Sequence, residues 1–177
     1  TVPINGTFSD EQRMVYDAVY EAQQAGIATA RPGARFAEVH RAAIAVIAQH
    51  LGDWGLLPVG VAEALGEHGG QYRRWMVHGT SHHLGIDVHD CAQARVENYR
   101  EGVLQPGMII TVEPGLYFKP DDELIPPALR GIGVRIEDDI LITSTGNENL
   151  TAALPRRSAD VEAWMSSIWT APESVIE

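Results

Sequence analysis

The segment His78–Asp90, with the sequence HGTSHHLGIDVHD, concentrates imidazole side chains that could bind a metal or move a proton. Besides its first residue it contains His82, His83 and His89, so four histidines fall within twelve residues. Neutral imidazole is a common metal ligand, and a nearby carboxylate often orients it by hydrogen bonding. A single histidine here would usually be structural, whereas four favour a functional role for at least one.

Two later segments each place a glutamate on or beside a strand. Glu113 ends the β-rich run MIITV and precedes a Pro-Gly turn, a position where functional side chains are common. In VRIEDD, the strand period of two puts Arg135, Glu137 and Asp139 on one face. Taken alone, either segment is also explained by solvated side chains or by an ordinary ion-pair network at a sheet edge.

Together, His82, Glu113 and Glu137 look like most of a binuclear metal-hydrolase site, and we expect them to converge on a common cavity. Imidazole and carboxylate ligands suit Mn²⁺, Co²⁺, Zn²⁺ or Fe²⁺. A bridging carboxylate such as Glu137 lets two ions share one water, which then ionises near neutral pH. Cys91 is the only cysteine, and we predict a small buried apolar residue there rather than a thiolate ligand.

The composition limits the classes of protein to which the chain can belong. It has 177 residues and a net charge of −11, which argues against nucleic acid and anionic membranes as partners. One cysteine excludes an internal disulfide, and no apolar run approaches the ~20 residues needed to span a bilayer. We therefore predict a cytoplasmic protein. The missing initiator Met and the opening TVPING indicate a piece of a longer polypeptide.

Helices are expected in the first half of the chain and strands in the second, which predicts an α+β fold with helices packed on a mostly antiparallel sheet. Ser9 and Gln12 have the spacing of a capping box at the first helix. The predicted helices run from Ser9 to between Gly26 and Pro32, over 36–51, over 59–65 and from Ser158 through Ile168. The predicted strands cover 108–112, 116–118 and 132–143.

The motifs HGTSHHLGIDVHD, GMIITVEPGLYF, RGIGVRIEDDILIT and GNENL resemble those of the aminopeptidase P (Xaa-Pro aminopeptidase) family of pita-bread metallopeptidases. The resemblance covers nearly the whole chain. It implies a pita-bread (creatinase/aminopeptidase-like) fold that is incomplete at its amino-terminal side. Residues 1–177 would form a single domain, the carboxy-terminal part of the catalytic domain. Prolidases share much of the pattern, but the HGTSH and RGIGVRIEDD forms are more similar to aminopeptidase P.

The resemblance implies a reaction and a ligand set. The family removes an N-terminal residue that precedes proline, and it uses two divalent ions, usually Mn²⁺, held by two Asp, one His and two Glu. His82 matches the ligand histidine, Glu113 matches a ligand glutamate, and Glu137 matches the bridging glutamate. Glu113 would also take the proton from the attacking water and relay it to the leaving proline nitrogen.

The resemblance also implies residues that handle the substrate. His78 and His89 match histidines that line the substrate site, and both are counted among the catalytic candidates with Glu113. His89 would stabilise charge that develops on the substrate carbonyl. Arg135 and Tyr117 match residues near the penultimate proline. Peptides with proline at the second position are therefore the predicted partners.

The sequence departs from the family at the two aspartate ligands, which should lie upstream of Thr1. We therefore predict that the isolated chain is inactive and binds at most one ion weakly. An uncovered sheet edge and apolar surface would favour a homo-oligomer. Three alternatives stay open: a Xaa-Pro dipeptidase (prolidase), a non-catalytic pita-bread binding module, and a methionine aminopeptidase of the same fold.

Overall fold

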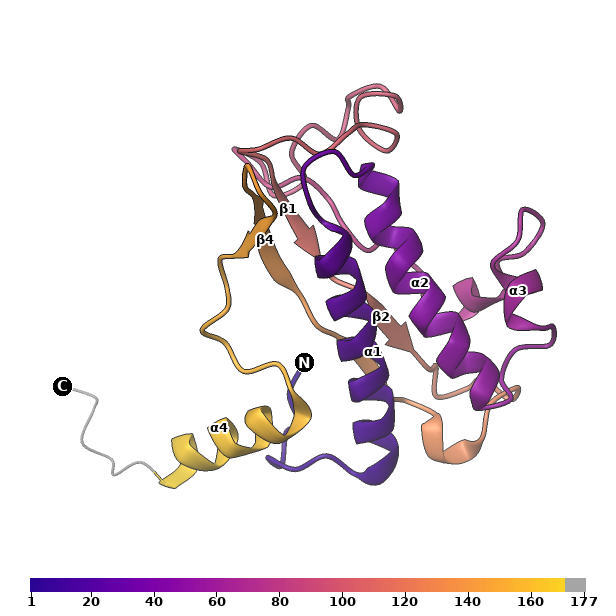
Figure 1. The fold of residues 1–177 in the computed structure, drawn as a ribbon. Helices are drawn as coiled ribbons and strands as arrows, with labels where there is room; N and C mark the ends of the chain where they lie inside the picture. The colour runs from indigo at the N-terminus through magenta and orange to yellow at the C-terminus, as the bar shows by residue number, and fades with distance from the viewer. Residues whose placement is uncertain (171–177) are drawn as a thin grey trace.

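The computed structural model describes residues 1–170, and two long helices dominate its first half (Figure 1). α1 spans Asp10–Thr29 and α2 spans Phe36–Asp53. Ser9 caps α1: its hydroxyl accepts the N–H of Gln12, whose side chain accepts the N–H of Ser9. The capping box satisfies donors that the first helical turn leaves free. The predicted start of this helix is therefore confirmed.

Three shorter helical segments follow the two long helices or connect the strands. α3 covers only Val61–Ala64, so the predicted helix over 59–65 is shorter than expected. Two 3₁₀ turns, η1 at Gln71–Arg74 and η2 at Pro127–Leu129, were not predicted. Such single turns are used as connectors and carry little periodic signal.

Within residues 1–170 the strands form two small antiparallel sheets. The first sheet has the order β1-β4-β5, and the second pairs β2 with β3. Only β5 was not predicted, since its polar sequence NEN has little strand propensity and depends on its pairing with β4. The strands are β1 Ile109–Val112, β2 Gly115–Tyr117, β3 Gly133–Arg135, β4 Asp138–Ile142 and β5 Asn147–Asn149.

The two sheets are nearly one, interrupted at a single point. The β1–β4 ladder ends with Val112 opposite Asp138, and the β2–β3 ladder resumes three residues later in the same register. Pro114 lies within the interruption and has no N–H to donate, so the ladder cannot run through it. The shared register places Glu113 opposite Glu137.

The prediction of one strand over residues 132–143 is therefore wrong in one respect, because the segment divides into β3 and β4. The predicted alternation nevertheless persists across the division. Val134 and Ile136 are buried, whereas Arg135 and Glu137 are exposed. The interruption changes the strand partner without turning any side chain to the other face.

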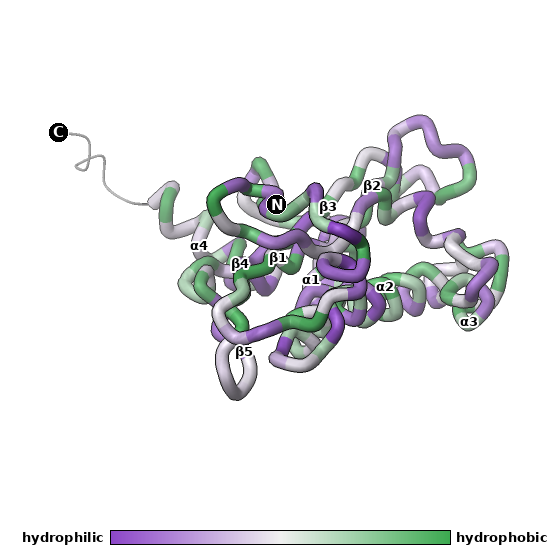
Figure 2. The backbone as a smooth tube through the Cα atoms, turned by 90° about the horizontal axis from the view of Figure 1, so that it is seen from above, coloured by the Kyte–Doolittle hydropathy of each residue, from purple (hydrophilic) through white to green (hydrophobic). Residues whose placement is uncertain are grey.

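The helices α1 and α2 lie together on one face of the strands (Figure 1). In Figure 2 hydrophobic and hydrophilic residues alternate along α2, as expected of a helix with one buried side. The close approach of helix and sheet depends on Gly26 of α1, where an added Cβ would lie 2.9 Å from Val112. The α+β architecture with helices on a mostly antiparallel sheet is confirmed.

The last described element, α4 Ser158–Thr170, is tied to the start of α1. Glu162 accepts the N–H of Phe8 at 2.8 Å and pairs with Arg13 at 2.6 Å. The predicted final helix is confirmed. No helix among residues 1–170 combines the length and the apolar character required to cross a membrane.

The prediction for Cys91 is wrong. The residue is exposed and has a φ of 56°, in a loop that follows the histidine segment. A hydrophobic side chain gains burial only where tertiary packing covers it, and the polar neighbours of Cys91 lie in the same exposed loop. Cys91 makes no contribution to the core.

Candidate metal centre

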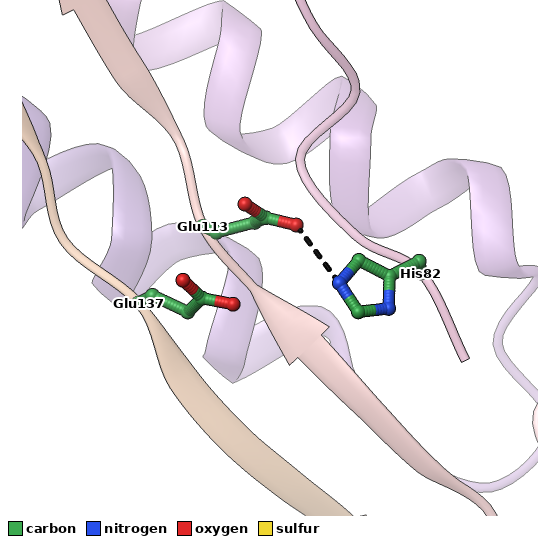
Figure 3. Close-up of side chains that lie close together, drawn as sticks. All are labelled: His82, Glu113 and Glu137. Carbon is green, nitrogen blue, oxygen red and sulfur yellow. Dashed lines mark ion pairs between the residues drawn. The ribbon is translucent and has the colours of Figure 1, made fainter. Parts of the chain in front are cut away.

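The two glutamates of the site lie opposite each other at the interruption between the ladders. Glu113 follows β1, Glu137 precedes β4, and both carboxylates face a common space (Figure 3). Val112, whose side chain points the other way, packs in the core against residues of α2. The alternation of the strand therefore directs the carboxylates to the side of the sheet away from the helices.

His82 reaches the same space from the segment 80–84, which runs along β1 on the edge not occupied by β4. Glu113 donates its N–H to the carbonyl of Thr80 at 2.7 Å, and Thr111 donates its N–H to the carbonyl of His82 at 2.9 Å. These backbone bonds make the segment behave as a further strand. The position of His82 beside Glu113 follows from this pairing.

The ligating atoms of His82, Glu113 and Glu137 all lie within 4.8 Å of one another. His82 Nε2 is 3.2 Å from Glu113 Oε1, and His82 Nδ1 is 3.0 Å from the carbonyl oxygen of His83. A carbonyl only accepts, so Nδ1 carries the ring proton and Nε2 faces the carboxylates. The predicted convergence of the three side chains is therefore observed.

Thr111 links two of these residues directly. Its hydroxyl accepts the N–H of His82 at 3.1 Å and donates to Glu113 Oε1 at 3.3 Å. Thr111 is 1% exposed. No role is predicted for Thr111 from the sequence, although the strand period places it on the face of Glu113. A buried hydroxyl on that face was the available signal.

The electrostatics of the cluster disfavour two free carboxylates. Partial desolvation by the surrounding groups raises the pKa of Glu137, although the residue is exposed on the surface, and the adjacent Glu113 carboxylate raises it further. Arg135, whose side chain is half-exposed, places Nη1 3.7 Å from Glu113 Oε2. A like charge at short range stabilises the neutral form of a carboxyl group. The pair would therefore gain from a bound cation.

A divalent metal ion fits this donor set. An imidazole nitrogen 3.2 Å from a carboxylate oxygen requires either a proton or a metal cation between the two acceptors, so the pair offers a nitrogen and an oxygen ligand to a metal ion. Ligand histidines commonly donate the other ring N–H to a carbonyl oxygen, as His82 does to His83. Nitrogen and oxygen donors together suit first-row divalent metals.

The predicted substrate residues His78 and Tyr117 contact each other. His78 Nδ1 is 2.7 Å from the carbonyl of Gly79, so this nitrogen carries the proton. His78 Nε2 is 2.7 Å from the Tyr117 hydroxyl, which therefore donates to it. Burial raises the pKa of Tyr117, which keeps the hydroxyl protonated. The hydrogen bond therefore links His78 to the last residue of β2 and fixes the positions of both side chains.

His89 and Arg135 flank the cluster from different sides. The His89 ring centroid lies 4.3 Å from that of His82. Arg135 lines a pocket at the edge of β3, and Thr1 donates to its carbonyl at 3.1 Å through the terminal amine. The pocket is lined by Thr1, Tyr117, Gly133, Arg135 and Glu137. The structure thus places all seven predicted site residues around one region, and their chemical roles stay predictions.

One imidazole and two carboxylates gathered beside an antiparallel sheet are typical of metal-dependent hydrolases. Comparison with known proteins agrees with this class. Residues 1–144 match the model of metallopeptidase family M24. The chain belongs to this family.

Within this family, the chain is similar to proteins named Xaa-Pro aminopeptidase. Xaa-Pro aminopeptidase 1 of Streptomyces coelicolor is 58% identical over 168 residues, which are 95% of this chain and 34% of that protein. Xaa-Pro aminopeptidase of Escherichia coli is 43% identical over 93% of this chain and 36% of its own length. The chain therefore spans about a third of the length of the curated relatives it matches.

Solved structures agree on the fold. The structure of Pseudomonas aeruginosa aminopeptidase PepP matches with a TM-score of 0.89 and 40% identity, over 96% of this chain and 38% of that one. The zinc-substituted Escherichia coli aminopeptidase P in complex with product matches with a TM-score of 0.85 and 42% identity, over 94% of this chain and 37% of that one. The fold is that of the pita-bread aminopeptidases, and the predicted family resemblance is confirmed.

Proposed function

We propose that residues 1–177 form one domain, the carboxy-terminal part of the catalytic domain of a Xaa-Pro aminopeptidase. In this proposal the complete enzyme cleaves the peptide bond between an N-terminal residue and a penultimate proline. The observation that carries it is the cluster of His82, Glu113 and Glu137, whose ligating atoms lie within 4.8 Å of one another. The Xaa-Pro aminopeptidases named above support the choice of substrate.

The donor set suits Mn²⁺, and two such ions would ionise the attacking water and polarise the scissile carbonyl. His82, Glu113 and Glu137 would contribute ligands to them. The remaining ligands would be two aspartates contributed by polypeptide that precedes Thr1. Thr1 lines the same pocket as Glu137, so polypeptide attached there would begin close to the site.

Glu113 and the side chains around the cluster would each have a separate role in the reaction. Glu113 accepts the proton of the water and passes it to the departing proline nitrogen. His89, beside the His82 ring, donates to the substrate carbonyl oxygen as charge develops on it. His78 and Tyr117, held together at 2.7 Å, shape the wall next to Arg135 where the proline ring would lie.

The proposal predicts that the isolated chain is inactive, because three ligands cannot hold two ions tightly while the carboxylates repel each other. The test measures hydrolysis of an Ala-Pro-Ala peptide with added Mn²⁺, by the 177-residue chain and by the longer polypeptide that contains it. Turnover only by the longer polypeptide is the expected result. Robust turnover by the pure chain, or none by either protein, would refute the proposal.

Cleavage of a dipeptide is the alternative that needs a separate test. A Xaa-Pro dipeptidase would hydrolyse Ala-Pro and leave Ala-Pro-Ala intact, whereas the proposed aminopeptidase releases alanine from the tripeptide. The HGTSH and RGIGVRIEDD segments, which contribute His82 and Glu137, favour the aminopeptidase. The predicted homo-oligomer and the predicted cytoplasmic location stay predictions, and light scattering tests the former.

A further inference from the structure

Three hydrogen bonds converge on the main chain of His83. Its N–H donates to the Tyr99 hydroxyl at 3.1 Å. Its carbonyl oxygen accepts the N–H of Asp90 at 3.0 Å and the Nδ1–H of His82 at the same distance. The backbone N–H and carbonyl of His83 therefore connect three parts of the molecule: the candidate ligand His82, the loop that contains Asp90, and Tyr99.

The side chain of His83 fastens this residue in place. The imidazole stacks on Phe36 with ring centroids 5.0 Å apart and an interplanar angle of 18°. It meets the edge of the Tyr99 ring at 4.8 Å, and Tyr99 in turn lies 5.2 Å from Phe36. Because Phe36 begins α2, the three rings anchor the residue to a long helix.

Tyr99 is itself held by the start of α2. Just after it, Gly102 accepts the N–H of Phe36 at 2.9 Å, and Arg100 accepts the N–H of Ala37 at 3.2 Å. These bonds satisfy donors of the first turn of α2, which has no intrahelical partners for them. The Tyr99 hydroxyl is consequently presented to the His83 N–H from a fixed backbone.

The shared carbonyl of His83 couples two parts of the candidate site. Its bond to His82 sets the tautomer and orientation of that ring, with Nε2 directed at Glu113. Its bond to Asp90 holds the residue next to His89, whose ring lies 4.3 Å from that of His82. A displacement of this carbonyl would move the candidate ligand and the candidate substrate residue together.

We propose that Tyr99 and His83 form a positioning unit that holds the His82 ring and the loop bearing His89 in a fixed mutual arrangement. Tyr99 and His83 act through their contacts with His82 and the loop of Asp90, so we class both as positioning residues rather than catalytic ones. The role of His82 as a ligand rests on the proposed function, whereas the geometric part of the inference does not. From the sequence, His83 is one of four histidines that share an expectation of function, without a role of its own.

Tyr99→Phe is the sharpest test, because it removes the hydroxyl and leaves the ring packed against His83 and Phe36. In the ¹⁵N NMR spectrum of the 177-residue chain, the Nδ1–H signal of His82 should broaden and exchange faster with solvent. The matched control is Tyr72→Phe, since Tyr72 is buried in a hydrophobic cluster other than the one that contains Phe36 and against which Tyr99 packs. The control should leave that signal unchanged. An unaltered His82 signal in Tyr99→Phe would overturn the inference.

The side-chain half of the unit is tested at His83. His83→Phe keeps a flat ring to stack on Phe36 and should preserve the His82 signal. His83→Ala removes the ring and should broaden the signal, with the unfolding temperature recorded for every variant. Equal signals in the two variants would show that the stacking has no part in the positioning.

The consequence for the enzyme is measured in the longer polypeptide. Tyr99→Phe should weaken Mn²⁺ binding by about threefold to tenfold, less than loss of a residue bonded directly to a ligand. It should lower kcat more than it raises KM. The NMR effect can be present while neither the 177-residue chain nor the longer polypeptide hydrolyses Ala-Pro-Ala. In that case the proposed function fails and the positioning unit stands. Unchanged Mn²⁺ affinity together with unchanged kcat would overturn its functional part.

Discussion

Glu137 and Asp138 are neighbours in the sequence, yet they occupy opposite kinds of environment. Asp138 is 1% exposed and fully engaged: Arg156 Nη1 lies 2.8 Å from one oxygen, and Thr151 donates to the other at 2.6 Å. Glu137 is exposed on the opposite face and lies against the Glu113 carboxylate. Strand alternation alone separates the two roles.

Asp122 is a second carboxylate, after Asp138, whose oxygens are occupied by donors of the protein. We call the clusters around these two residues closed. Asp122 accepts two bonds from the Arg74 guanidinium, at 3.0 and 2.8 Å, and one from Trp75 Nε1 at 3.2 Å. The N–H of Leu124 supplies a further donor at 3.0 Å. A carboxylate whose lone pairs are filled by the protein stabilises the fold. One that faces another carboxylate and an imidazole lone pair has capacity left for a cation.

We call the cluster of His82, Glu113 and Glu137 the open cluster. The largest expected effect is the loss of metal binding when one of its residues is changed. Glu137→Gln should weaken Mn²⁺ binding by well over about 100-fold in the longer polypeptide, because a direct ligand matters more than a residue behind it. Isothermal titration measures the affinity. Asp139→Asn, on the same strand face but outside the cluster, is the matched control and should bind as the unmodified protein does. Equal affinities for Glu137→Gln and the control would remove the contrast.

Changing the closed cluster should affect stability instead. Asp138→Asn leaves the mostly buried Arg156 without its charged partner and should lower the free energy of unfolding by about 3 kcal/mol. Urea unfolding of the 177-residue chain, followed by circular dichroism, provides the value. Glu137→Gln should show no such loss. A neutral result for Asp138→Asn would mean that the Arg156 pair is not structural.

Thr111 offers a smaller effect that tests how the open cluster is held. Thr111→Val keeps the shape but removes the hydroxyl shared by His82 and Glu113, and Mn²⁺ affinity should fall about tenfold. Thr111→Ser retains the hydroxyl and should restore most of the affinity. Titration of both variants in the longer polypeptide decides the question, and equal losses would indicate a packing effect.

The metal-free stability should respond to pH in opposite directions at the two kinds of cluster. The folded pKa of Glu137 is raised, so its favourable contribution is present below the ordinary value of 4.5 and is lost as pH rises through the raised pKa. Glu137→Gln should therefore melt higher than the unmodified chain at neutral pH without metal, with the difference shrinking below pH 4.5. A lower melting temperature for the variant at pH 7 would contradict this.

For Asp122 the sign is reversed. Hydrogen bonds from Arg74 lower its pKa below the ordinary 3.8, so its contribution is present above that value and is lost as pH falls through the lowered pKa. Asp122→Asn should reduce stability at pH 6 and lose less on acidification than the unmodified chain. Melting curves from pH 6 to pH 2 compare the slopes, and identical slopes would exclude this pair as a source of acid sensitivity.

The periodic parts of the molecule could be predicted from the sequence. The capping box at Ser9, the two long helices and the alternation around Glu137 are local patterns, and each was found where expected. The division of the strand over 132–143 was missed, although Pro114 on the partner strand is its physical cause. A break in a ladder depends on which residue lies opposite, and that is known only after pairing.

The candidate site divides in the same way. The residue types at positions 82, 113 and 137 came from motifs, whereas Thr111 and the Tyr99–His83 contact did not. Cys91 was placed wrongly because its small, apolar character favours burial, while the loop around it packs on nothing that covers it. Contacts between distant segments are invisible to spacing rules, since they depend on how the segments pack.

The amino-acid sequence by itself determined the donors available for chemistry, the faces on which they project and the helices that cover the sheet, because those properties depend on a few neighbouring residues. Only the tertiary structure decided which carboxylates pair closely with an arginine, as Asp138 and Asp122 do, and which remain available to bind a cation. That choice depends on whether a positive side chain from a remote segment, such as Arg156 beside Asp138, comes within about 3 Å of the oxygen.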